Sequence, residues 1–112
     1  MEIKRHEKFD REFKKYLKKY RTLDSDLGVL QKAIVSNPTG DKSKHWNLLR
    51  QSGAKCLFKV RMMCRSVKGS SFRVIYYYDG QVFELVFIEI YFKGDKEAED
   101  KERIDAFWNS KI

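Results

Sequence analysis

The sequence of 112 residues is poor in cysteine, histidine and proline, with two, two and one of each. Cys56 and Cys64 lie eight residues apart on a predicted strand, and about 25 Å of extended chain between them excludes a disulfide. Their spacing matches no metal-binding motif either. We therefore expect reduced structural thiols, no metal site and no cofactor.

Long hydrophobic runs are also missing. No segment approaches the roughly 18 apolar residues of a membrane span, and the N-terminal "MEIKRHEKFD" has no apolar signal region, so we expect a cytoplasmic protein. There is no repeat, low-complexity segment or linker. A hydrophobic content of 42% with 14% aromatic residues is typical of globular proteins, and the length predicts one domain over residues 1–112.

Positive charge is plentiful and unevenly distributed. The net charge is +8, and residues 39–73, with nine basic residues and one acidic residue, account for an excess of that same size. Basic proteins of this size commonly bind nucleic acid or an acidic protein. The alternative is a basic surface without a partner.

The spacing of apolar residues predicts an α+β fold. A short edge strand in residues 1–9 precedes two helices, whose apolar residues recur at helical intervals (Phe9, Phe13, Tyr16, Leu17 and Tyr20; then Leu23, Leu27, Leu30 and Ile34). The break near Arg21 is short, which favours an antiparallel helix hairpin, and Pro38 ends its second helix. The lysines of the first helix are either a solvated face or RNA contacts.

Strands are predicted at 56–64, 72–79 and 82–92. Residues 39–54 read as a turn-rich connection over the end of the sheet, and 68–71 as a loose turn. Asp79-Gly80 indicates a two-residue hairpin. A final helix should begin after Asp95 as N-cap and bury Ile104, Phe107 and Trp108. The result is a small antiparallel sheet of about four strands with a mixed edge.

Strand alternation gathers the cations of the central hairpin. Lys59, Arg61 and Arg65 share one face of the first strand, and Arg73 shares one face of the second with Tyr77. Almost no acidic residues match them, so we expect a concave face that binds phosphates while tyrosines stack on bases. The alternative is a ladder of solvated charges.

These residues resemble a known family. "FKVR", "KGSSFRVIYYY" and "VFIEIYFKGDKEAED" are similar to motifs of the RelE/ParE superfamily of bacterial toxins, in particular its RelE- and HigB-like ribonucleases. The specific part of the resemblance is residues 57–95. The order of elements resembles that family over essentially the whole chain. The resemblance implies the toxin of a type II toxin–antitoxin system, which cleaves messenger RNA on the ribosome without metal and is inhibited by an antitoxin. It also implies a monomeric free toxin that forms hetero-oligomers with its antitoxin.

The resemblance also implies roles for individual residues. Arg61 and Arg73 would hold the scissile phosphate, and Lys59 would take the proton of the attacking 2′-hydroxyl. Lys93 would either protonate the leaving 5′-oxygen or stabilise its charge. Tyr91 is a candidate substitute in catalysis, because this chain lacks the tyrosine or histidine that several members carry near the C-terminus. Arg65, Lys68 and Lys55 are expected to contact RNA.

Three questions stay open at this point. Glu89 is either a base or, as we expect, a salt-bridge partner, whereas His6 and His45 are expected to be surface residues. A ParE-like toxin that binds gyrase without cleaving RNA is an alternative, which the basic residues disfavour. An inactive basic RNA-binding module is the other.

Overall fold

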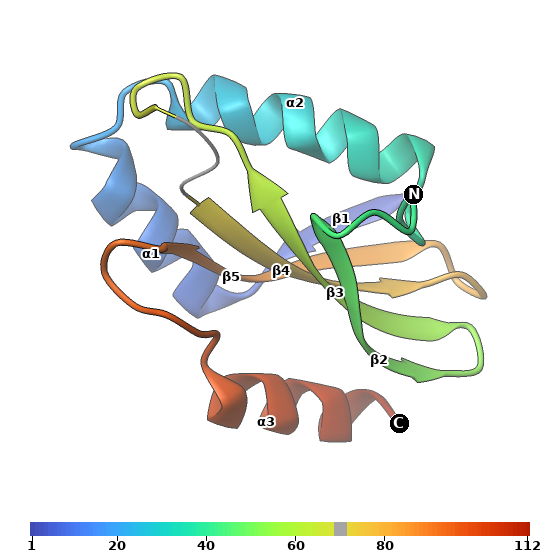
Figure 1. Cartoon of the computed structure of the whole chain (residues 1–112). Coiled ribbons are helices and arrows are strands. Elements are labelled where there is room, and N and C mark those ends of the chain that lie inside the picture. Colours follow the sequence, from blue (N-terminus) through green and yellow to red (C-terminus); the bar gives the residue numbers. More distant parts are fainter. Residues whose placement is uncertain (69–71) are drawn as a thin grey trace.

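Five strands form one mixed sheet in the order β1-β5-β4-β3-β2 (Figure 1). The computed structural model describes residues 1–68 and 72–112, so part of the predicted turn at 68–71 lies outside the described residues. β1 runs parallel to β5 and every other neighbouring pair is antiparallel, which confirms the predicted α+β fold with a mixed edge. The strands are β1 (Glu2–Arg5), β2 (Trp46–Ser52), β3 (Lys55–Met62), β4 (Phe72–Asp79) and β5 (Glu84–Phe92).

Two helices, α1 (Glu7–Leu17) and α2 (Leu23–Ser36), cover one face of the sheet (Figure 1). The predicted apolar stripes carry this packing, because Phe9 on α1 and Leu27 and Ile34 on α2 are all fully buried or nearly so. Phe58 and Tyr76 stack on this face from adjacent strands, with ring centroids 5.4 Å apart. The main core therefore lies between this face and the two helices.

The third helix, α3 (Lys101–Lys111), lies on the opposite face of the sheet (Figure 1). Its predicted stripe is confirmed: Ile104 and Trp108 are buried in a second apolar cluster, against which Phe107 packs. The sheet contributes Leu57, Ile75, Tyr77, Val86 and Ile88 to this cluster. The helix α3 therefore covers the apolar half of the face on which the sequence predicts a basic concavity.

Three local predictions are wrong. Residues 46–52 form β2, an edge strand on β3, because the turn at Gly53, with φ 59°, folds them back onto the sheet. The β4–β5 loop spans residues 80–83, with Phe83 at φ 54°, instead of a two-residue hairpin. The last helix begins at Lys101 with Asp100 as N-cap, because tertiary contacts engage Asp95 and Asp100.

Cys56 and Cys64 are both buried and unpaired, as expected for reduced structural thiols. Within residues 1–68 and 72–112, no helix has the length and hydrophobicity needed to cross a membrane.

Candidate functional site

The sheet register places the predicted cations next to one another. Arg61 on β3 lies directly opposite Arg73 on β4, and Arg73 lies opposite Tyr91 on β5. In the neighbouring row, Lys59 lies opposite Ile75, which in turn faces Glu89. Directly opposed residues have Cβ atoms about 5 Å apart, and alternate residues on a strand are roughly 7 Å apart. We call Lys59, Arg61 and Arg73 the basic cluster.

An irregularity in β5 brings Glu89 and Tyr91 to this face. The β4–β5 register shifts between Ile75 and Tyr76, so that Ile75 faces Glu89 while Tyr76 faces Phe87. Such a bulge adds one residue to one strand and changes which side chains point to a face. As a result Val86 and Ile88 contact α3 on this face, whereas Glu89 and Tyr91 line up with the basic cluster.

Arg73 is buried, with 7% of its surface exposed, which argues against the alternative of a solvated charge ladder at this position. Its guanidinium donates to the carbonyl oxygen of Phe72 at 3.1 Å. Burial, and then the charge of Arg61, lower the pKa of Arg73, while Tyr91 acts in the opposite direction. Two like charges held side by side in this way are suited to share an anion.

Tyr91 is also buried, and Lys96 lies over its ring at 5.2 Å from the centroid. Burial raises the pKa of Tyr91 to about 12; Glu99 and Glu89 add to this effect and Arg73 opposes it. The phenol is therefore neutral at pH 7, which suits a hydrogen-bond donor and does not suit a general base.

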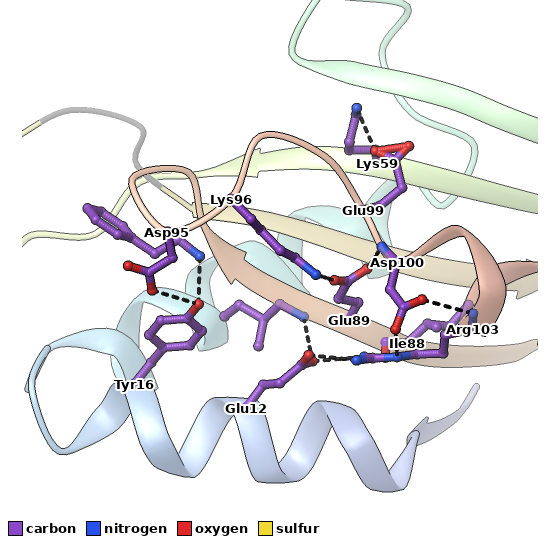
Figure 2. Close-up of polar contacts among 12 residues, drawn as sticks. Glu12, Tyr16, Lys59, Ile88, Glu89, Asp95, Lys96, Glu99, Asp100 and Arg103 are labelled. Atoms are coloured by element: carbon purple, nitrogen blue, oxygen red, sulfur yellow. Dashed lines mark hydrogen bonds and ion pairs between the residues drawn. The ribbon is translucent and has the colours of Figure 1, made fainter.

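An acidic segment, residues 95–100, follows β5 and brings Glu99 against Lys59 of the basic cluster (Figure 2). Glu99 accepts a hydrogen bond from Lys59 Nζ at 3.0 Å, and the two side chains are 13% and 25% exposed. The expectation that the cations lack matching acids is therefore wrong for Lys59, and it is also wrong for Arg65, which pairs with Asp26. In each case the acid comes from a segment remote in sequence, so strand alternation gave no sign of it.

Several contacts hold the acidic segment in place (Figure 2). The fully buried Glu89 forms an ion pair with Lys96 and accepts a hydrogen bond from the backbone N–H of Asp100 at 2.8 Å. The salt-bridge role expected for Glu89 is thus what the structure shows. Tyr16 on α1 donates to Asp95 at 3.1 Å, which fixes the other end of the segment.

Arg103 joins α3 to α1 and β5 (Figure 2). Its two terminal nitrogens donate to the two carboxylate oxygens of Glu12 at 2.9 and 2.7 Å, and one of them also donates to the carbonyl oxygen of Ile88 at 2.9 Å. Burial alone would lower the pKa of Arg103. The hydrogen bonds with Glu12 outweigh this effect, and the net result is a raised pKa. Arg103 also lies 3.5 Å from Asp100, the last residue of the acidic segment. The segment is therefore anchored at Asp95 by Tyr16 and at Asp100 by Glu89 and Arg103.

Comparison with known proteins gives one informative result. No family model matches the sequence, and no curated protein matches it. A chain in the crystal structure of the archaeal RelE–RelB complex from Pyrococcus horikoshii OT3 has a similar structure, with a TM-score of 0.60 at 14% sequence identity. The match covers 85% of this chain and 97% of that chain. This chain has a RelE-like fold.

Within this RelE-like fold, the remaining predicted site residues are scattered. Lys93 is exposed and directly follows β5. Arg65 is engaged by the buried Asp26, with Nε and Oδ1 at 3.0 Å. Lys68 is exposed at the limit of the described residues. Lys55 starts β3, where its ammonium donates to the carbonyl oxygen of Lys111, about 20 Å along the strand from Arg61.

The two histidines lie outside the cluster. His6 is the N-cap of α1, where its Nδ1 accepts from the backbone N–H of Lys8 at 3.0 Å. His45 is exposed, and its carbonyl oxygen accepts from the backbone N–H of Arg61 at 2.9 Å. Sequence reasoning missed Lys96 and Glu99 as members of the site. The density of charge in "DKEAED" was the one available signal, and a helix was assigned there instead.

Proposed function

We propose that residues 1–112 form one toxin domain of a type II toxin–antitoxin system, and that it cleaves messenger RNA on the ribosome. The observation that carries the proposal is the direct pairing of Arg61 with Arg73 on one face of a sheet with a RelE-like fold. Two arginines placed opposite each other on adjacent strands repel one another unless an anion lies between them. A phosphodiester supplies that anion.

The proposed reaction is an attack by the ribose 2′-hydroxyl oxygen on the adjacent phosphorus. The bond from phosphorus to the 5′-oxygen breaks, which leaves a 2′,3′-cyclic phosphate and a 5′-hydroxyl. Arg61 and Arg73 would hold the phosphate and stabilise the charge that grows on its oxygens, a type of contact that is typically worth roughly 10²–10³ in rate. The leaving 5′-oxygen takes up one proton as the bond breaks, either from the Lys93 ammonium or from water while Lys93 stabilises its charge.

Proton transfer from the 2′-hydroxyl is assigned to Lys59, with Tyr91 as a neutral donor beside the phosphate. Lys59 Nζ donates to Glu99 in the structure, so its nitrogen can accept a proton only after that contact is broken and the amine is neutral. Tyr91 lies opposite Arg73, within the same row of the sheet. The Lys, Arg and Tyr side chains assigned here are not metal ligands of the usual kind, so we propose a reaction without metal.

The proposed partner is an antitoxin with an acidic, amphipathic segment. A groove of about 290 Å³ between α2 and the end of β3 is lined mainly by apolar side chains, of which Val29 and Met63 are 69% and 68% exposed. Arg61 and Arg65 also line the groove. An apolar floor with cations beside it favours a helix with acidic residues along one edge. The free toxin would be a monomer.

Induced expression in a bacterial host, followed by mapping of messenger RNA 5′ ends, tests the proposed function. We expect growth arrest and new ends within translated regions, and no such ends when translation initiation on the reporter transcript is blocked. Growth arrest with intact transcripts would favour a ParE-like, gyrase-binding toxin. RNA binding without arrest or cleavage would favour an inactive binding module.

A further inference from the structure

We propose that the acidic segment is a built-in competitor of the substrate: Glu99 occupies the position on Lys59 that a phosphate of single-stranded RNA takes, and it must leave before RNA binds. This inference rests on the proposed function. It adds a state in which the free protein blocks part of its own site.

The contact of Glu99 with Lys59 is chemically similar to the contact that an RNA phosphate would make with Lys59. A carboxylate at 3.0 Å from an ammonium presents an anionic oxygen, as a phosphate does. Both side chains are mostly shielded from solvent, so salt screens this pair less than a surface pair. Burial alone would raise the pKa of Glu99, but hydrogen bonds from its own backbone and from Lys59 outweigh it and lower that pKa.

The charge of Glu99 also reaches Tyr91, which lies beside the basic cluster on β5. Glu99 is the strongest charged contributor to the raised pKa of Tyr91, the residue opposite Arg73. The acidic segment "DKEAED" holds four acidic residues and one lysine, so it brings net negative charge to the face where the sheet gathers arginines. A phosphate approaching Lys59 therefore meets repulsion from the carboxylate that already neutralises that lysine.

The anchors of the segment allow Glu99 to leave without unfolding the domain. Glu89 holds Lys96 and the backbone of Asp100, but these contacts do not involve the Glu99 carboxylate. Residues 95–99 lie between β5 and α3, outside any helix or strand. Rotation of the Glu99 side chain alone, without movement of the backbone, separates its carboxylate from Lys59. We expect RNA held at high local concentration to displace Glu99, whereas dilute RNA competes poorly.

The first test compares Glu99→Gln with Glu97→Gln. Glu97 is an exposed acid on the same segment, so both variants remove one negative charge. The probe is a short unstructured RNA with 2′-O-methyl riboses, which cannot be cleaved, and binding is followed by fluorescence anisotropy at physiological salt. We expect Glu99→Gln to bind roughly fivefold more tightly than Glu97→Gln. Equal affinities would overturn the proposal.

A second measurement needs no RNA. Acylation of the Lys59 amine by a small reagent, followed by mass spectrometry, should be several-fold faster in Glu99→Gln than in Glu97→Gln. Unchanged acylation would overturn the proposal, because the contact would then not shield Lys59. If acylation rises and all variants bind RNA equally, competition is refuted while the RNA-binding face stands. If acylation rises and no variant binds RNA, the inference falls together with the proposed function.

A double-mutant cycle locates the effect. In a Lys59→Gln background, the gain in RNA affinity from Glu99→Gln should disappear, because the cation for which the two anions compete is gone. A gain that persists undiminished would place the repulsion elsewhere and would overturn the assignment to Lys59.

Discussion

Substitution of Asp26 by asparagine should destabilise the protein, because this carboxylate joins α2 to the chain that follows β3. The side chain is 5% exposed and accepts hydrogen bonds from Thr22 Oγ1 at 2.7 Å and from the backbone N–H and Nε of Arg65, both at 3.0 Å. Hydrogen bonds to a charged group contribute about 1.5–3 kcal/mol each. The asparagine amide is neutral and has one acceptor oxygen, so it keeps only part of the three hydrogen bonds, and its N–H group faces the donors of Thr22 or Arg65. We expect a loss of about 2 kcal/mol in the free energy of unfolding.

Urea denaturation followed by circular dichroism measures this loss at pH 7, and the melting temperature should fall by roughly 8 °C. Asp24→Asn is the matched control. Asp24 is exposed in the same first turn of α2, so only its interaction with the helix dipole, about 0.5 kcal/mol, should be lost. A free energy for Asp26→Asn within about 0.5 kcal/mol of the control would refute the reasoning.

The pH dependence provides an independent test. Burial acts to raise the pKa of Asp26, but hydrogen bonds from Thr22 and Arg65 outweigh it, and the net effect lowers that pKa. A carboxyl group whose pKa is lowered by folding stabilises the protein above its unfolded pKa of about 3.9, and this stabilisation is lost as the pH falls through the folded value. The difference between parent and Asp26→Asn should thus be complete at pH 7 and shrink below about pH 4. A difference that stays constant to pH 2 would contradict the assignment.

Three further predictions follow from the site. Tyr91→Phe should slow RNA cleavage about tenfold with less than about 1 kcal/mol change in unfolding free energy, and unchanged cleavage would remove Tyr91 from the site. Arg103→Lys cannot form the two-pronged contact with Glu12, so amide hydrogen exchange in α3 should accelerate, unlike in the exposed control Arg11→Lys; equal exchange would contradict the anchoring role. Antitoxin association, measured by stopped flow, should be roughly tenfold faster at low than at physiological salt. Association rates that do not depend on salt would exclude the groove between α2 and the end of β3 as the docking site.

Much of the fold was predictable because its elements follow simple periodicities. The helical spacing of Phe9 and Phe13 and of Leu23 and Leu27 identified the helices that carry the main core. The edge strand β2 was missed because its sequence, "WNLLRQS", does not alternate between apolar and polar residues. It pairs with β3 through backbone hydrogen bonds and a register shift near Leu48, and neither leaves a mark in side-chain pattern.

The candidate site was predictable where it depends on strand alternation and not where it depends on tertiary contacts. Alternation correctly put Lys59, Arg61 and Arg73 on one face, since an antiparallel register preserves parity. It was wrong for Arg65, because β3 ends at Met62. The bulge in β5, the contact of Glu99 with Lys59 and the burial of Arg73 each arise from packing between distant segments. The predicted N-cap of the last helix, Asp95, was wrong because local propensity alone cannot distinguish Asp95 from Asp100, the observed N-cap.

The most direct test of the central claim is the rate of messenger RNA cleavage by Arg73→Lys in a purified translation system, measured by mapping 5′ ends. Lysine keeps the positive charge and most of the buried volume but loses the two-pronged geometry of the guanidinium, so folding should persist. We predict a roughly 100-fold slower cleavage at unchanged positions, and full activity in the control Arg50→Lys, whose arginine side chain is 35% exposed. Cleavage by Arg73→Lys at the rate of the parent would contradict the account.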